Sequence, residues 1–467
     1  MKSSLHELLF DNRLVHQLPA DPITENYRRQ VTGAIYSYVK PSPVRNPQLL
    51  AGAADVAALL DLPTDIFQQP DFAQVFGSNQ ILVGMEPHAC CYGGHQFGNW
   101  AGQLGDGRAI NLGEVINSKG EHWTLQLKGA GPTPYSRSAD GLAVLRSSVR
   151  EFLCSEAMFH LGVPTTRALS LITTGEMVRR DMFYDGNPQF EPGAVVCRVA
   201  PSFTRFGNFE ILSARGDIEL LKRLADFTIR TDFPHLLPTG DHPIDADIYQ
   251  QWFTDICIAT AQLIAHWMRV GFVHGVMNTD NMSICGLTID YGPYGWLEGY
   301  DPDWTPNTTD AQGRRYRYGN QPRIALWNLT QLANAIYPLI NSVEPLQAAL
   351  EQYRVEYERC VQRDLANKLG LHKFDPEQDQ QLMDELFTVL QSAEIDMTIF
   401  YRQLAQYSLN DIDQYTDQEW FDKVMIAYYT TPSSTLKEQM VSWLRRYGQR
   451  LQRDVVLHNV NDAVRRT

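Results

Sequence analysis

The stretch His274-Gly-Val-Met-Asn-Thr-Asp280-Asn281-Met-Ser, followed by Thr288-Ile-Asp290-Tyr-Gly292, contains the residues that decide the fold of this chain. Asn281 and Asp290 supply hard oxygen atoms, which suit Mg²⁺ or Mn²⁺ ions that bridge phosphates. Asp280 stands directly before Asn281 and adds a further carboxylate. The stretch therefore predicts a metal site that serves a bound nucleotide.

The spacing is that of a protein-kinase active site in which one residue has been replaced. Kinases and related phosphotransferases carry His-x-Asp at the start of this loop, an Asn five positions after that Asp, and then a metal-binding Asp-x-Gly. Val276 occupies the position of the catalytic Asp, and an apolar side chain cannot accept a hydroxyl proton. We therefore expect an ATP-binding fold without ordinary kinase chemistry, in which His274 braces the loop.

A glycine-rich segment upstream predicts a phosphate-binding turn. In Gly102-Gln-Leu-Gly105-Asp-Gly107-Arg108, glycines would let the backbone approach a triphosphate and donate amide hydrogen bonds. A plain hairpin loop is the alternative, because such turns are common. Apolar and polar residues alternate in segments 108–115 and 122–128, which predicts two antiparallel strands joined by a turn at 117–120. This order of glycine-rich loop, strand, turn and strand favours a nucleotide-binding turn over a plain hairpin loop.

Lys128 ends the second of these strands, where kinases place a lysine that contacts phosphate oxygens. A helix near 145–161 would offer Glu151 as its partner. Alternatively, Lys128 is an ordinary surface lysine and Glu151 an exposed carboxylate on the helix. Asp140-Gly141 precedes this helix, where Asp is a natural N-cap and the first amides can contact a nucleotide.

Arg198 and Arg205 flank the sequence Val-Ala-Pro-Ser-Phe-Thr. Two arginines on a strand and the loop after it can clamp a phosphate chain with planar, bidentate donors. Ion pairing with the abundant acidic residues is the alternative.

Composition predicts a soluble, cytoplasmic enzyme. The 467 residues are 44% hydrophobic and 20% charged, and 40 basic against 54 acidic residues give a net charge of −14, which argues against a nucleic-acid surface. Seven scattered Cys favour a reducing compartment over a disulfide framework. The first residues lack the apolar run of a signal peptide, and no window of apolar residues is long enough to span a membrane.

The order of elements predicts an α+β, bilobal, kinase-like fold with a β-rich N-lobe and a helical C-lobe. Residues 1–80 are expected to form an N-terminal extension, 81–212 the N-lobe with the nucleotide loop, and 213–467 the C-lobe with the metal loop. Further strands are expected at 168–174, 194–199 and 207–212. Helices are expected at 247–270, 324–340, 345–370, 376–392, 394–408 and 435–454.

Several long strings resemble the selenoprotein O family, the SelO-type protein adenylyltransferases with a pseudokinase fold. The matching strings are Tyr92-Gly-Gly-His-Gln-Phe-Gly98, Gly102-Gln-Leu-Gly-Asp-Gly-Arg-Ala109, Leu127-Lys-Gly-Ala-Gly-Pro-Thr-Pro-Tyr-Ser-Arg137, Asp140-Gly-Leu-Ala-Val-Leu-Arg-Ser-Ser148, Arg198-Val-Ala-Pro-Ser-Phe-Thr-Arg-Phe-Gly207, Gly275-Val-Met-Asn-Thr-Asp-Asn-Met282 and Leu287-Thr-Ile-Asp-Tyr-Gly-Pro293. They run across roughly residues 25 to 300.

The resemblance implies that ATP is bound head-to-tail relative to kinases, so that AMP is transferred to Ser, Thr or Tyr hydroxyls of proteins, including possible self-modification. Some members of the family use UTP, especially with Mn²⁺. The resemblance gives Asp280 the role of base and makes Asn281 and Asp290 the ligands of Mg²⁺ or Mn²⁺. It implies nucleotide binding by Gly105, Gly107, Arg108, Lys128, Asp140, Gly141, Arg198 and Arg205, with Glu151 in support.

The chain departs from the family pattern after Cys360, its last cysteine. Family members typically carry a Cys or selenocysteine near the C-terminus, so redox control through that residue is not expected here, and the chain is interpreted as truncated or as a shorter member. Two other functions stay open: a kinase of the aminoglycoside-phosphotransferase type, against which Val276 counts, and an inactive nucleotide-binding scaffold.

Overall fold

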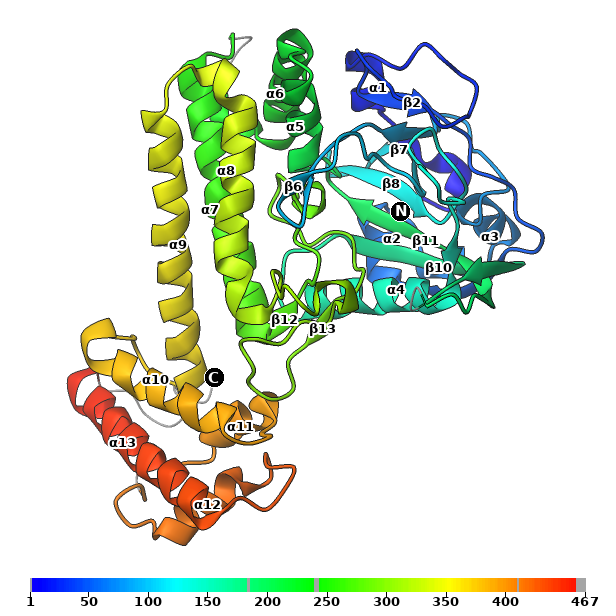
Figure 1. Ribbon diagram of the computed structural model, residues 1–467. Helices are drawn as coiled ribbons and strands as arrows, with labels where there is room; N and C mark the ends of the chain where they lie inside the picture. Colours follow the sequence, from blue (N-terminus) through cyan, green and yellow to red (C-terminus); the bar gives the residue numbers. More distant parts are fainter. Residues whose placement is uncertain (1, 183–184, 239–242, 410, 459–467) are drawn as a thin grey trace. The chain divides into compact units, whose positions relative to one another are not determined.

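A computed structural model describes residues 2–182, 185–238, 243–409 and 411–458 (Figure 1). The chain divides into two compact units, each built from several stretches of sequence. Unit 1 comprises Met1–Leu263, Val276–Gly292 and Ile324–Tyr353, and unit 2 comprises Ile264–Gly275, Pro293–Arg323 and Arg354–Thr467. All of the predicted site residues belong to unit 1. The three-part division at residues 80 and 212 stays a prediction.

Unit 1 is built around a nine-stranded antiparallel sheet in which the central order is β2-β4-β7-β8-β11-β10-β3. Its strands are β1 (Leu9–Phe10), β2 (Tyr36–Tyr38), β3 (Gln48–Gly52), β4 (His88–Cys90), β7 (Ala109–Ile116), β8 (His122–Lys128), β9 (Ala143–Val144), β10 (Arg167–Arg180) and β11 (Gln189–Ala200). Two small sheets pair β5 (His95–Gln96) with β6 (Asn99–Trp100) and β12 (Phe272–Val273) with β13 (Gly295–Trp296).

The predicted strand pair upstream of Lys128 is confirmed. β7 and β8 pair antiparallel, with Ala109 opposite Lys128 and Ile116 opposite His122. β11 pairs with the other edge of β8, which places Arg198 opposite Gln126. Period-2 alternation and the Asn-Ser-Lys-Gly turn were sufficient to predict this hairpin.

Helix α4 (Leu145–His160) confirms the helix predicted at 145–161 and packs on β10 and β11 (Figure 1). Its N-cap is Val144, which makes no side-chain cap hydrogen bond. The prediction that Asp140 caps this helix is therefore wrong. The carboxylate of Asp140 instead accepts from the amide of Leu142, because the short strand β9 separates the two positions.

The strand predicted at 207–212 is wrong, because α5 (Phe206–Ala214) is a helix. A short apolar run is compatible with a buried strand or a buried helix, and periodicity alone does not separate them. Reciprocal hydrogen bonds between Arg205 and Asn208 begin the helix, and every residue from Phe206 to Leu212 is buried.

The remaining helices largely match the predicted ones. They are α1 (Arg13–Gln17), α2 (Ala54–Leu59), α3 (Pro70–Phe76), α6 (Ile218–Asp232), α7 (Ala246–Val270), α8 (Gln321–Ile340), α9 (Glu344–Leu369), α10 (Pro376–Gln391), α11 (Met397–Leu404), α12 (Asp417–Met425) and α13 (Ser434–His458). The helices α7, α8, α9, α10, α11 and α13 correspond to predicted ranges, whereas no range was predicted for α1, α2, α3, α6 and α12. None of the helices within the described residues is both long and apolar enough to cross a membrane.

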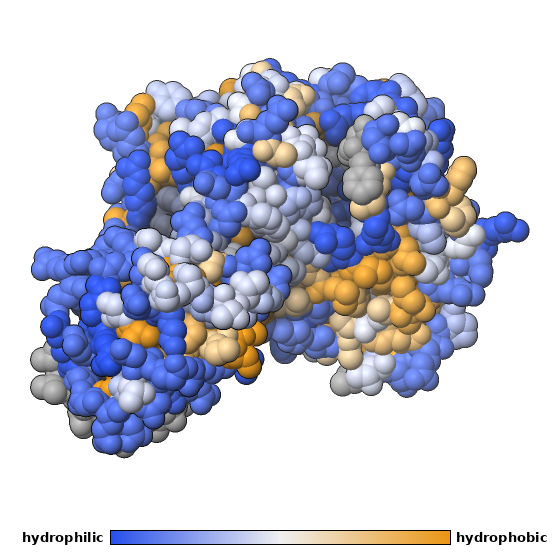
Figure 2. Space-filling model, turned by 60° about the horizontal axis from the view of Figure 1, so that its bottom comes forward, coloured by the Kyte–Doolittle hydropathy of each residue, from blue (hydrophilic) through white to orange (hydrophobic). Residues whose placement is uncertain are grey.

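The predicted α+β fold, with a β-rich N-terminal part and a helical C-terminal part, is confirmed (Figure 1). The core of the sheet region contains Ile110, Leu112, Leu125 and Leu127. A second core in unit 2 joins α10 to α13 around Trp420. Figure 2 shows an apolar patch on the face that carries α4, where Leu153 and Phe159 are 60% and 45% exposed.

Candidate active site

A buried group of opposite charges lies where β8, β11 and α4 meet. The Nζ of Lys128 is 2.5 Å from Oε2 of Glu151, and Arg198 donates to the other oxygen of the same carboxylate. Glu151 is 3% exposed. Burial opposes its charge, but Arg198 and Lys128 outweigh burial and lower the pKa of Glu151. The predicted pairing of Lys128 with Glu151 is thus present.

Asp290 lies beside this pair and contacts three cations. Its Oδ1 accepts from Arg198 at 2.8 Å, its Oδ2 accepts from Arg205 at 2.7 Å, and the Nζ of Lys128 is 3.9 Å away. Burial would raise the pKa of Asp290, but these cations hold it well below its usual range. The residue has a φ of 57°, a left-handed conformation that is uncommon for a residue other than Gly. Asp290 is therefore held as an anion in an unusual backbone geometry.

Lys128 carries a shifted pKa of its own. Burial, followed by the neighbouring charge of Arg198, lowers the pKa of Lys128 to about 8 despite the opposing effect of Glu151. The exposed side chain of Arg108 contributes to the same lowering, so its charge lies near Lys128. A further anion such as a phosphate would relieve this crowding of positive charge.

Asp280 belongs to a short 3-10 helix, Thr279–Asn281. Its Oδ2 accepts a hydrogen bond from Gln96 at 3.2 Å, and its Oδ1 is buried without a hydrogen-bond partner among the described residues. Burial raises the pKa of Asp280 to about 6, although Gln96 and Arg205 oppose the shift. A buried carboxylate oxygen without a partner is costly, so the geometry favours a ligand at this oxygen.

The segment Val276–Gly292, named the catalytic loop here, has donor atoms that fit a hard divalent cation. The amide nitrogen of Asn281 donates to the carbonyl of Val276 at 2.9 Å, which leaves its side-chain oxygen as an acceptor. Each oxygen of Asp290 accepts one hydrogen bond from an arginine and retains a lone pair. Carboxylate and amide oxygens are ligands that Mg²⁺ and Mn²⁺ accept. Asn281 and Asp290 therefore remain suitable metal ligands.

The glycine-rich turn packs against the segment around Tyr135. A Cβ on Gly105, whose φ is +89°, would lie 2.5 Å from the Tyr135 ring, and one on Gly107 would lie 2.9 Å from the Tyr135 carbonyl oxygen. Thr133 donates to the carbonyl of Asp106 at 2.8 Å. These glycines are needed for close packing within the protein, and their predicted contact with phosphate stays a prediction.

The predicted nucleotide contacts of Asp140 and Gly141 also stay predictions. Arg180 donates to both oxygens of Asp140, at 2.7 and 2.8 Å. Gly141 has a φ of +75°, and a Cβ there would lie 2.2 Å from the backbone of Gly131. Asp140 is thus already paired, while Gly141 permits two backbone segments to cross.

Three polar residues of this site were not given roles by the sequence. Gln96 contacts Asp280, Gln126 accepts from Arg198 at 2.9 Å, and the ring of Tyr92 lies 4.6 Å from the guanidinium carbon of Arg205. Tyr92 and Gln96 belong to the string Tyr92-Gly-Gly-His-Gln-Phe-Gly98. The polar and aromatic residues within this glycine-rich string could have indicated that Tyr92 and Gln96 belong to the site.

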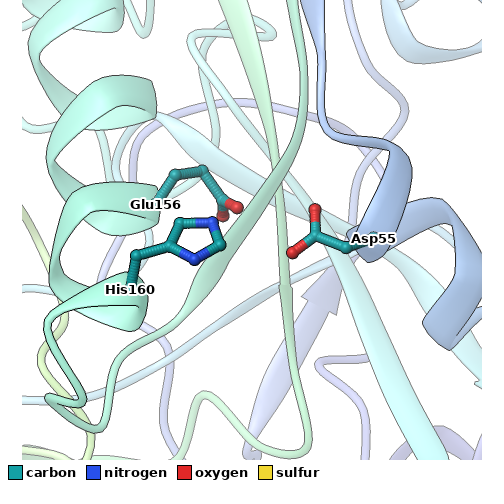
Figure 3. A group of neighbouring side chains, drawn as sticks. All are labelled: Asp55, Glu156 and His160. Atoms are coloured by element: carbon teal, nitrogen blue, oxygen red, sulfur yellow. The ribbon is translucent and has the colours of Figure 1, made fainter.

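A second group of possible metal ligands lies elsewhere in unit 1. Asp55 of α2 faces Glu156 and His160 of α4, with one donor atom of each within 4.8 Å of the others (Figure 3). Arg167 donates to both Asp55 and Glu156, at 2.6 Å in each case. This guanidinium already neutralises the carboxylates, so the group is best described as an ion-pair cluster.

Replacing Arg198 or Arg205 by Lys is expected to slow nucleotide transfer, because it removes about 1–3 kcal/mol of transition-state stabilisation. The Arg198 guanidinium donates to Glu151, Gln126 and Asp290 together, a planar geometry that one ammonium group cannot reproduce. Initial rates of nucleotide transfer measure the effect. Arg146→Lys, at a half-exposed pair with Glu191, is the control. Wild-type rates in both site variants would restrict the two arginines to a structural role.

Comparisons with known proteins identify the family of this chain. A family model described as "Protein adenylyltransferase SelO" matches residues 23–466. A protein nucleotidyltransferase YdiU from Azoarcus sp. (strain BH72) is 59% identical over 450 residues, which cover 96% of this chain and 84% of the relative. Another, from Rhodopirellula baltica, is 58% identical over 453 residues with the same coverage.

One matching solved structure is ROP2 from Toxoplasma gondii, described as a virulence factor with a protein-kinase fold and no enzymatic activity. The two chains are 14% identical, the match covers 65% of this chain and 86% of ROP2, and the TM-score is 0.28. The family model and the two close relatives carry the assignment: the chain belongs to the SelO family of protein adenylyltransferases.

Proposed function

We propose that this protein transfers AMP from ATP to hydroxyl groups of proteins and releases pyrophosphate. The observation that carries the proposal is the placement of Asp280. Val276 leaves the position of the kinase base without a proton acceptor. Asp280 stands next to Asn281, and one of its buried carboxylate oxygens has no hydrogen-bond partner in the described part of the chain. A base in this place could accept a proton from a nucleophile that attacks the phosphorus of a phosphate bound beside Asn281.

The residues of the chain divide the chemistry among them. The hydroxyl oxygen of the acceptor forms a bond to the α-phosphorus of ATP while Asp280 accepts the hydroxyl proton. The bond between that phosphorus and the departing pyrophosphate breaks. A divalent metal ion held by Asn281 and Asp290 would neutralise phosphate charge. Lys128, Arg198 and Arg205 are the cations available to neutralise the pyrophosphate.

The finer assignments follow the family resemblance. We propose Ser, Thr and Tyr hydroxyls as acceptors, with self-modification included, and either Mg²⁺ or Mn²⁺ as the metal. UTP is proposed as a second donor. We further propose a cytoplasmic location and no nucleic-acid partner, in line with the net charge of −14 and the 7 Cys residues.

Separately labelled ATP tests the proposal. Incubation with α-labelled ATP and Mg²⁺ or Mn²⁺ is expected to label the protein or an added protein acceptor, and γ-labelled ATP is not. Each event should add the mass of AMP to a hydroxyl residue. Label arriving only from the γ position would support the kinase alternative. Nucleotide binding without transfer of either label would support the inactive scaffold.

A further inference from the structure

A cavity of about 260 Å³, with a largely apolar lining that includes several polar side chains, lies beside the catalytic loop. Its lining includes His95 and Trp100 of the β5–β6 hairpin, Glu210 and Ser213 of α5, and Gln331 and Asn334 of α8. Pockets for drug-sized ligands span about 300–1,000 Å³, so this cavity is suited to a single side chain more than to a nucleotide.

The cavity contains a buried carboxylate that is only half satisfied. Glu210 is 3% exposed, and its Oε2 lies 2.5 Å from Nδ1 of His95. Its Oε1 is buried and has no hydrogen-bond partner among the described residues. Leaving such an oxygen without a donor costs free energy, which a hydrogen-bond donor entering the cavity would recover.

Aromatic rings next to this carboxylate favour a cation as the ligand. The ring of His95 lies 5.2 Å from that of Trp100 and 5.5 Å from that of Trp327. Trp100 is 40% exposed, so part of its ring is open to an incoming group. Indole faces attract ammonium and guanidinium groups, and a carboxylate forms its strongest hydrogen bonds with such donors.

The same hairpin holds the catalytic loop. The amide of His95 donates to Oγ1 of Thr279 at 2.7 Å, and the next residue, Gln96, donates to Asp280. The cavity is therefore one residue along the chain from the group that contacts the base. This adjacency allows one acceptor polypeptide to place a side chain in the cavity and a hydroxyl at Asp280.

We propose that this cavity binds a Lys or Arg side chain of the acceptor protein, close in sequence to the modified residue. The inference rests on the proposed function, since it requires a protein acceptor. The bound cation donates to Oε1 of Glu210 and lies against Trp100. The cavity thereby selects acceptor sites that have a basic neighbour.

Synthetic peptides with one Tyr acceptor test this inference. Peptides carry Lys, Arg, Ala or Glu at each of the four positions on either side, and AMP transfer from α-labelled ATP is measured with the full-length protein. We expect kcat/KM to be about tenfold higher for Lys or Arg than for Ala at one position, and lowest for Glu. We expect Glu210→Gln to reduce the basic-to-Ala ratio to about one, because it removes the charge and keeps the shape.

Two further variants keep the result interpretable if Glu210→Gln fails to fold. Asn334→Lys adds a competing ammonium at an exposed position of the cavity and is expected to lower the same ratio. Glu219→Gln removes an exposed carboxylate outside the cavity and is expected to leave the ratio unchanged. AMP transfer without any preference for a basic position, or with a preference that survives both cavity variants, overturns the subsite alone. Absence of transfer from α-labelled ATP to every peptide and to the protein itself would instead overturn the proposed function.

Discussion

Replacing Asp290 by Asn is expected to reduce AMP transfer by about a hundredfold to a thousandfold, comparable to the loss of a preorganised transition-state contact. The amide keeps the shape of the carboxylate but loses its charge. It would also place an NH2 group or a single carbonyl oxygen between the donors of Arg198 and Arg205, which now contact one oxygen each. We therefore expect weaker metal binding at the proposed site and a displaced arrangement of the two arginines.

Rates with α-labelled ATP across a range of Mg²⁺ concentrations measure this effect, and calorimetry with ATP and Mg²⁺ measures binding. We expect weaker metal-dependent binding together with the lower rate. Asp65→Asn, at an exposed carboxylate of the same unit, serves as the matched control. Unchanged affinity and rate in Asp290→Asn would remove Asp290 from the active site.

Replacing Glu151 by Ala is expected to lower the free energy of unfolding by about 3–5 kcal/mol, because it leaves buried charges without their partner. Lys128 and Arg198 both contact this carboxylate, and they are 8% and 3% exposed. Chemical denaturation followed by circular dichroism measures the change. Glu191→Ala, which breaks the half-exposed pair with Arg146, is expected to cost less than about 1 kcal/mol.

The cost of losing Glu151 should also depend on pH. Its pKa is lowered in the folded protein from an ordinary value of 4.5, so its charge stabilises the fold above that pH. This contribution is lost as the pH falls through the lower pKa of the folded state. The difference between wild type and variant should therefore narrow in acid below about pH 4.5. A difference that is small at neutral pH would contradict the importance of this buried pair.

The order of elements along the chain was sufficient to predict the parts of the site that depend on local pattern. The β7–β8 hairpin has clear alternation and ends at Lys128, and α4 places Glu151 as predicted. The short apolar run in α5 lacked such a signal, and its start depends on hydrogen bonds between Arg205 and Asn208. Period and length did not separate a buried helix from a buried strand there.

Contacts between distant segments could not be predicted from the sequence, for a different reason. Arg198 and Asp290 are 92 positions apart, and Gln96 and Asp280 are 184 apart. A single sequence shows the types of these residues but not which of them meet. The arginines were assigned to phosphate, and their hydrogen bonds to Asp290 became visible only once the sheet and the catalytic loop were placed together.

The backbone around Asp280 leaves no room for side chains. A Cβ on Gly94 would lie 2.8 Å from Oδ1 of Asp280, and one on Gly207 would lie 2.1 Å from the carbonyl oxygen of Gly93. The hairpin, the first turn of α5 and the catalytic loop are thus packed closely against one another at these two glycines. A side chain at Gly94 would displace Asp280, the proposed base, and would therefore alter proton transfer as well as the hairpin. Attempts to redirect this enzyme to new acceptors should vary the side chains of the cavity and leave Gly93, Gly94 and Gly207 intact.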